Sequence, residues 1–139
     1  SGDADFVVKL IDVFPESFTY DSAYCCGDSK SLSLGGYQML VRGEIFRGRY
    51  RNSMERPEPF DTSKIEKVVI ELPDVAHTFR KGHRLMVQVQ SSWFPLFDMN
   101  PQKYVDIYHC REDDFIPARI SVERSPEHSS CIYLPVLKP

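Results

Sequence analysis

Apolar residues in this chain recur with a period of two far more often than with the 3.6-residue period of a helix. Residues 6–13 form a nearly continuous, β-branched apolar run that stops before Pro15, as expected of a strand buried on both faces. Residues 39–50 alternate, and Gly43 and Gly48 within them suggest bends or bulges. Residues 85–90 alternate between an apolar face and a mostly polar one. These three segments are predicted to be strands.

Four shorter segments have a similar strand pattern and bring the expected number of strands to about seven: 65–72, 104–109, 117–124 and 131–134. In 117–124 we expect Ala118, Ile120 and Val122 to point inward. Helix signals are weak, because Thr62, a candidate cap, is followed three residues later by Ile65 rather than by Glu or Gln. Short strands without intervening helices predict an all-β fold, an antiparallel sandwich or barrel. Residues 20–36 are expected to form a long loop.

Size and charge narrow the class of protein. The chain has 139 residues, of which 42% are apolar and 27% charged, so we expect one domain over residues 1–139 with one modest core. No apolar run approaches the roughly 18 residues of a membrane span, and no secretory leader is recognisable. The net charge of −3 gives little attraction to nucleic acid or anionic lipid. We therefore expect neither nucleic acid nor a membrane as a partner; the cellular compartment stays open.

Candidate catalytic residues are weak. The segment most similar to a G-x-S-x-G nucleophile elbow is 31–35, around Ser33. Ser31 stands where the motif has its first glycine, and the residues that follow have the alternating pattern of a strand, whereas the motif requires a helix there. Ser33 is better interpreted as a loop serine. We predict no catalytic residue in this chain.

Metal and thiol chemistry are also poorly supported. The residues His109, Cys110, His128 and Cys131 are of metal-ligating types, but no C-x-x-C pair is present, and adjacent strand residues point to opposite faces. Cys25 and Cys26 have no neighbouring Lys, Arg or His that would lower a thiol pKa. We expect no metal and no cofactor, and the disulfide state of the four cysteines is not fixed by their spacing.

Two charged stretches have simple interpretations. Arg47, Arg49 and Arg51 share one strand parity and alternate with aromatic residues, which suggests a nucleic-acid surface but equally a solvent face or an ion-paired edge. The acidic run 112–114 lacks the residue spacing of an EF-hand and is expected to be a solvated loop.

The most informative stretch is the strand at 85–90 and the aromatic-rich loop that follows it. Large rings on a loop either fill the domain's own core or form a surface that something else covers. From the residues alone we favour the first, because exposing such rings is unfavourable. The candidate interface or substrate-access residues are Ser91, Ser92, Trp93, Phe94, Pro95, Phe97 and Asn100.

Four pieces of the chain carry a resemblance to a known family: residues 3–13 (DADFVVKLIDV), 43–51 (GEIFRGRYR), 79–101 (FRKGHRL through SSWFPLFDMNP) and 134–136 (LPV). In this order, and over nearly the whole chain, the sequence resembles the C-terminal domain of the group formed by X-Pro dipeptidyl-peptidases, cocaine esterase and α-amino acid ester hydrolases, which includes cephalosporin acylases. Two positions depart from the family pattern, which usually has Asn where Trp93 stands and Arg where Leu96 stands.

The resemblance implies a jelly-roll β-sandwich of the galactose-binding-like type. It implies a parent enzyme with its catalytic serine, aspartate and histidine on an α/β-hydrolase domain N-terminal to this one, and none of their motifs matches a position here. In the family the jelly roll packs on that domain and helps to close the substrate pocket and the oligomer interfaces, which favours a covered surface at Trp93, Phe94, Pro95 and Phe97. Because the family's domain begins several strands before Asp3, the sandwich is expected to lack its first strands and to expose edges.

Three hypotheses follow, in decreasing order of support. The first is a non-catalytic C-terminal domain of a serine hydrolase that cleaves peptide, amide or ester bonds, with the catalytic domain as its partner and with homo-oligomer contacts as a second kind of interface. The alternative is a free-standing carbohydrate-binding module, because sandwiches of this type hold sugars with exposed aromatic rings and polar loops. The third is a cysteine- or metal-dependent protein.

Overall fold

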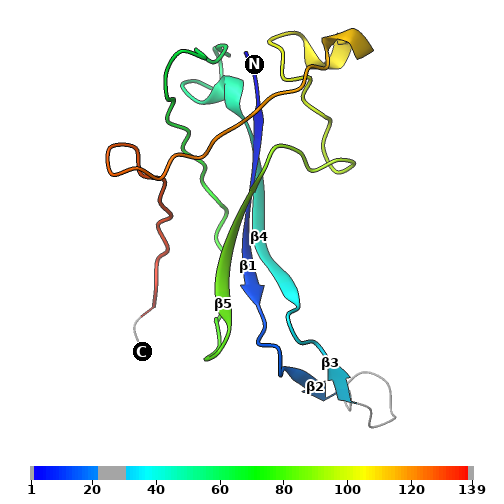
Figure 1. The fold of residues 1–139 in the computed structure, drawn as a ribbon, viewed down its shortest axis with the longest axis vertical. Helices are drawn as coiled ribbons and strands as arrows, with labels where there is room; N and C mark the ends of the chain where they lie inside the picture. The colour runs from blue at the N-terminus through cyan, green and yellow to red at the C-terminus, as the bar shows by residue number, and fades with distance from the viewer. Residues whose placement is uncertain (1, 22–30, 138–139) are drawn as a thin grey trace.

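A computed structural model describes residues 2–21 and 31–137. Cys25, Cys26 and the rest of residues 22–30 in the predicted loop 20–36 lie outside the described residues, and the loop prediction is wrong at 20–21 and 31–33, which are strand residues. The strands are β1 (Asp5–Val13), β2 (Thr19–Asp21), β3 (Ser31–Ser33), β4 (Gln38–Arg47) and β5 (Arg84–Gln90), and the short 3-10 helices are η2 (Gly48–Tyr50), η3 (Ile107–His109) and η4 (Glu112–Asp114). The strands form one antiparallel sheet in the order β4-β1-β5 and a second, two-stranded one of β2 and β3 (Figure 1).

Strand β1 is the centre of the fold, as its continuous apolar run predicts. It pairs with β4 on one side and β5 on the other, and Val7, Leu10, Ile11 and Val13 are buried. Burial on both faces requires this pattern, because successive strand residues point to opposite sides of a sheet. The long strands confirm the interpretation of 6–13 and 85–90, and that of 39–50 as far as residue 47; at 48–50 it is wrong, because these residues form η2. The all-β class with antiparallel sheets is confirmed as well.

The predicted irregularity in β4 lies at a different residue. The register shifts between Leu10 and Ile11, whose partners are Arg42 and Leu40, so Val41 is the extra residue of a bulge. Gly43 instead makes room for an aromatic ring: a Cβ atom there would lie 2.7 Å from Cη2 of Trp93. Gly48 ends the strand, and a Cβ atom there would lie 2.7 Å from the carbonyl oxygen of Ala4.

The four weaker strand predictions are wrong for the described residues. Residues 65–72, 117–124 and 131–134 belong to no strand, apart from one isolated bridge between Arg124 and Ser129. Residues 104–109 end in η3, where the Asp106 carboxylate accepts a hydrogen bond from the backbone N–H of Tyr108. A strand needs a ladder with a neighbour as well as an alternating pattern, and no described segment supplies one here.

Large apolar side chains are unusually exposed. The predicted inward face of 117–124 is solvated, with Ala118 exposed and Ile120 and Val122 at 38% and 50% exposure. Leu85, Val87 and Val89 on β5 are 43%, 38% and 44% exposed. Residues 115–137, here called the C-terminal arm, contain no strand and bend at 125–128, between the bridged residues Arg124 and Ser129 (orange to red in Figure 1). The expected core therefore exists around β1 but is small.

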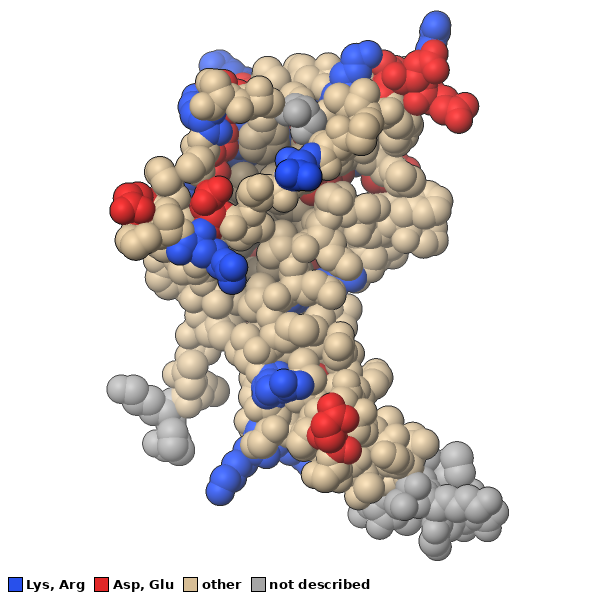
Figure 2. All heavy atoms as spheres, in the orientation of Figure 1, with Lys and Arg blue, Asp and Glu red and all other residues tan. Residues whose placement is uncertain are grey.

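The total accessible surface area also indicates that the core is small. The chain has an accessible surface of 10989 Å², against about 7,400 Å² for a compact monomer of its 16.1 kDa mass. Lys, Arg, Asp and Glu are scattered over the face seen in Figure 2, with wide uncharged areas between them. In the described ranges no helix is long and apolar enough to cross a membrane.

Candidate functional site: the aromatic loop and its polar anchor

The aromatic loop, residues 91–101, starts where β5 ends and immediately turns back on itself. The backbone N–H groups of Leu96 and Phe97 donate to the carbonyl oxygen of Trp93, at 2.9 and 3.2 Å. The Ser92 hydroxyl accepts from the N–H of Phe94 at 3.2 Å. These local bonds give the loop a defined shape, so its side chains point in set directions.

Trp93 points inward. The Lys9 ammonium lies 4.4 Å from the centroid of its ring, a cation–π contact, and the ring covers the space left by Gly43. The Phe97 ring follows at a centroid distance of 6.3 Å. Trp93 is therefore a half-buried ring that packs on β1 and β4, and its place in an interface stays a prediction.

The neighbouring residues point outward. Phe94 is 65% exposed and Leu96 64%, while Phe97 is 40% exposed. Ser91, Ser92 and Pro95 are exposed as well. One loop thus divides into a packed ring and an apolar surface, and whether another domain covers that surface stays a prediction.

Asn100 holds the far end of the loop. It is 6% exposed, and its Nδ2 donates to Asp3 Oδ2 at 2.9 Å and to Asp5 Oδ1 at 2.8 Å. Its Oδ1 accepts from the backbone N–H of Gln102 at 2.8 Å. Arg49 completes the group, donating from Nε and Nη2 to Asp3 Oδ2 at 2.9 and 2.6 Å. We call Asp3, Asp5, Arg49 and Asn100 the polar anchor.

The anchor balances buried charge with hydrogen bonds. Burial raises the pKa of Asp5 above its usual value, and the hydrogen bond from Asn100 and the charge of Arg47 only partly oppose this. Arg47 Nε lies 3.5 Å from Asp5 Oδ1. An amide suits position 100, because one Nδ2 group donates to two carboxylates without adding a charge.

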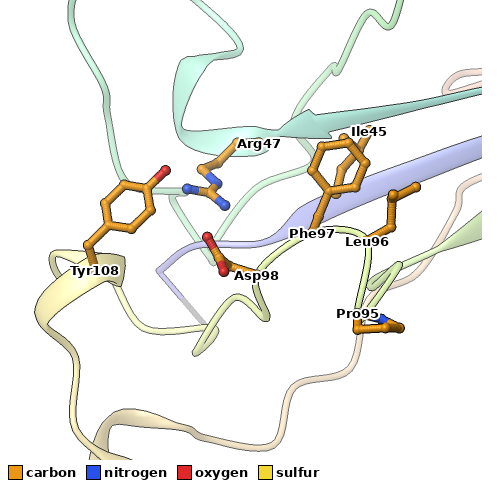
Figure 3. Close-up of a pocket in the computed structure, with 7 residues that line it drawn as sticks. All are labelled: Ile45, Arg47, Pro95, Leu96, Phe97, Asp98 and Tyr108. Carbon is orange, nitrogen blue, oxygen red and sulfur yellow. The ribbon is translucent and has the colours of Figure 1, made fainter.

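A shallow pocket of about 310 Å³ opens between the aromatic loop and the end of β4. Figure 3 shows the Arg47 guanidinium and the Asp98 carboxylate turned toward each other, with Tyr108 on one side and apolar side chains on the other. The lining residues are Ile45, Arg47, Pro95, Leu96, Phe97, Asp98 and Tyr108. A second hollow of about 380 Å³ includes Ser91, Ser92 and Asn100 together with residues of the C-terminal arm.

A buried aspartate with two histidines lies elsewhere, on β1. Asp12 Oδ2 is 2.9 Å from His77 Nε2, and Asp12 Oδ1 is 2.8 Å from His83 Nδ1. The His83 ring packs against Phe14 at a centroid distance of 4.6 Å. No Ser, Thr or Cys side chain in the described ranges bonds to either imidazole, so the group ties residues 77–83 to the sheet and lacks a nucleophile.

The weaker chemical candidates do not come together. Among residues 2–21 and 31–137 no cluster of three or more His, Cys, Asp or Glu side chains could hold a metal. Cys110 donates to the carbonyl oxygen of Ile107 at 3.0 Å, and His109 pairs with Asp106 at 2.7 Å. Ser33 is an exposed residue at the end of β3.

The arginine stretch has a clear explanation. Arg47 pairs with Asp5, Arg49 with Asp3 and Arg51 with Glu66. The three arginines are therefore ion-paired, but the prediction that they share one face of a strand is wrong: only Arg47 lies on β4, because Arg49 is in η2 and Arg51 follows it. The polar anchor was not predicted from the sequence. Asp3 and Asp5, two residues apart at the start of a strand, nevertheless indicate two carboxylates on one face.

The family described as "X-Pro dipeptidyl-peptidase C-terminal non-catalytic domain" matches residues 1–132. The chain belongs to this family. The resemblance found in the sequence is therefore confirmed, and the absence of catalytic candidates agrees with the family's description as non-catalytic. The galactose-binding-like detail of the fold stays a prediction.

Relatives carry the same segment as a small part of a longer protein. The cocaine esterase of Rhodococcus sp. (strain MB1 Bresler) is 34% identical over 136 residues, which are 98% of this chain and 20% of that protein. Two solved structures, an aminopeptidase from the marine sediment archaeon Thaumarchaeota archaeon and an α-amino acid ester hydrolase labelled with selenomethionine, each superpose with a TM-score of 0.70 at 44% identity over 84% of this chain. The chain spans 18% and 17% of them, respectively.

Proposed function

We propose that this chain is the non-catalytic C-terminal domain of a serine hydrolase acting on peptide, amide or ester bonds. In this role it packs on a catalytic α/β-hydrolase domain of the same polypeptide and shapes substrate access with the aromatic loop. The observation that carries the proposal is the apolar surface left open on β5, on Phe94 and along the C-terminal arm. Family membership and the relatives' names support the kind of parent enzyme.

The open surface has the size of an extensive intramolecular interface. The accessible surface exceeds that of a compact monomer by about 3,600 Å², whereas a standard protein–protein interface buries roughly 800 Å² on each partner. The apolar share of this excess is unfavourable in water, at roughly 25 cal/mol per Å². Because this chain matches only about a fifth of its relatives, the remaining polypeptide is the natural source of the covering surface.

The names of the relatives indicate the chemistry of the proposed parent. An esterase, an aminopeptidase and an amino acid ester hydrolase all transfer an acyl group to water, and a serine nucleophile can serve each reaction. In this role the domain supplies walls and support, while the reacting groups lie in the rest of the polypeptide.

The first test measures hydrolysis. The 139-residue chain alone should give no turnover of aminoacyl-prolyl or ester substrates, and the full-length polypeptide should hydrolyse at least one of them. Turnover by the chain alone, surviving re-purification, would contradict its non-catalytic role.

The second test measures docking in the full-length protein. Val87→Asp places a charge on the exposed β5 face and should detach the domain, seen as faster limited proteolysis and a loss of kcat/KM. Met54→Asp is the matched control, because Met54 is 74% exposed and lies outside the proposed surface. Equal behaviour of the two variants would contradict docking through β5. Saturable glycan binding by the chain, lost in Phe94→Ala, would instead favour the carbohydrate-binding module.

A further inference from the structure

The pocket beside the aromatic loop holds a cation whose terminal nitrogens are available. Arg47 is the last residue of β4, and its Nε faces the buried Asp5 at 3.5 Å. Within the described part of the chain, its Nη1 and Nη2 make no hydrogen bond, and its side chain is 22% exposed. The guanidinium is therefore fixed at one side while its outer fork faces the pocket.

The opposite wall holds an anion. Asp98 is exposed, and in the described ranges its carboxylate takes part in no ion pair or hydrogen bond, including none with Arg47. Figure 3 shows the two charged groups facing each other from different elements, β4 and the aromatic loop. The pocket thus contains one positive and one negative group that are not paired with each other.

The remaining walls are apolar and aromatic. Ile45, Leu96 and Phe97 line one end of the pocket, and Tyr108, 75% exposed, lies at the other end with its ring centroid 5.9 Å from Arg47 Cζ. The volume of about 310 Å³ is at the lower end of the roughly 300–1,000 Å³ range of small-molecule sites. The ligand must therefore be small.

We propose that this pocket binds a zwitterionic α-amino acid with an apolar side chain. Its carboxylate accepts charge-assisted hydrogen bonds from the Nη atoms of Arg47, its ammonium group donates to Asp98, and its side chain lies on Leu96 and Phe97. A simple anion meets repulsion from Asp98, and a simple cation meets repulsion from Arg47. Only a molecule with both charges and an apolar part satisfies every wall.

The inference rests on the proposed function for the source of the ligand. Hydrolysis of an aminoacyl ester or of an amino-terminal peptide bond releases a molecule of this class, and the loop that would shape substrate access forms one wall of the pocket. Binding itself requires no catalytic residue of this chain.

The experiment is titration calorimetry of the full-length protein with L-phenylalanine, N-acetyl-L-phenylalanine and L-phenylalaninamide. The first has both charges, the second lacks the cation, and the third lacks the anion. Saturable binding of L-phenylalanine is expected, with at least tenfold weaker binding of each analogue. Absence of saturable binding, or equal affinity for all three compounds, overturns the proposal.

The decisive variant is Asp98→Asn, because Asp98 has no ion-pair or hydrogen-bond partner among residues 2–21 and 31–137, whereas Arg47 also pairs with Asp5. It should weaken L-phenylalanine binding at least tenfold and should not weaken binding of N-acetyl-L-phenylalanine, because the repulsion between Asp98 and this anion is removed. Asp113→Asn, at another exposed acid, is the matched control and should bind as the wild type does. Unchanged affinity in Asp98→Asn overturns the proposal, and it also reveals binding at a site elsewhere in the protein.

The outcome is separable from that of the proposed function. If L-phenylalanine binding depends on Asp98 but the Val87→Asp and Met54→Asp variants dock equally well, the amino acid site is retained and docking through β5 is contradicted. Detachment in Val87→Asp without any dependence on Asp98 would do the reverse.

Discussion

The two ends of the aromatic loop reverse the usual arrangement, in which apolar side chains are buried and polar side chains are exposed. At one end the polar Asn100 is buried between two carboxylates, while at the other the apolar Phe94 is 65% exposed. Buried polar groups are tolerated where they are hydrogen-bonded, and exposed apolar patches mark surfaces that are covered by something else. The comparison shows two roles within one loop: the polar anchor holds the loop in place, and the loop exposes its apolar side chains at the surface.

Breaking the anchor should have the largest effect. Asp3→Ala removes the partner of Arg49, whose side chain is 11% exposed while that of Asp3 is 0% exposed. Loss of one member of a buried ion pair destabilises a protein by about 3–5 kcal/mol. The opening free energy of β1 amides, measured by hydrogen exchange in the full-length protein, should fall by an amount in this range.

The other end of the loop supplies the control. When both variants are compared in the 139-residue chain, where Phe94 is exposed, Phe94→Ala should change the exchange of the same β1 amides by less than about 0.5 kcal/mol, as expected at an exposed site. Equal effects of Asp3→Ala and Phe94→Ala would remove the distinction between anchor and presented surface.

An intermediate effect is expected where Trp93 meets the sheet. Gly43→Ala places a Cβ atom 2.7 Å from Trp93 Cη2, and such overpacking destabilises by about 1–3 kcal/mol. Trp93→Ala removes the clash, so the double variant should be less destabilised than the sum of the single variants. Strict additivity in this double-mutant cycle, read from the same β1 amides, would show that the ring does not cover Gly43.

The smallest expected effect is a change of stability with pH that depends on Asp5. Because burial raises the pKa of Asp5 in the folded state, folding favours the protonated carboxyl group. Its contribution to stability is complete below the ordinary Asp pKa of about 3.9 and is lost as the pH rises through the raised pKa. Carbon-13 NMR titration should show Asp5 titrating above that ordinary value, and Asp5→Asn should flatten the pH dependence of β1 amide exchange in this window. An Asp5 pKa at or below the ordinary value would contradict the balance of burial over hydrogen bonding.

The sequence predicted those parts of the fold in which pattern and partner are both present. Strands β1, β4 and β5 were predictable because each has a period-two pattern and finds a neighbour in the sheet. The segment 117–124 has the same kind of pattern, but no described strand pairs with it. Periodicity reports which face of a segment is apolar and cannot report whether a neighbour exists.

The candidate site was predictable only in outline. The aromatic loop was identified from composition, but composition does not indicate that Trp93 packs half-buried on the sheet while its neighbour Phe94 is exposed. Asn100 lies 97 and 95 positions from its partners Asp3 and Asp5, so no local pattern could indicate that it is buried. The pairing of Arg47 with Asp5 likewise depends on the sheet register, which places the two residues opposite each other.

The most direct test of the covered surface is hydroxyl-radical footprinting of the 139-residue chain and of the full-length protein. Phe94 and the exposed β5 residues Leu85 and Val87 should react several-fold more slowly in the full-length protein, while Met54 should react equally in both. Equal reactivity of Phe94, Leu85 and Val87 in the two proteins would contradict the claim that this apolar surface is an interface within a larger hydrolase.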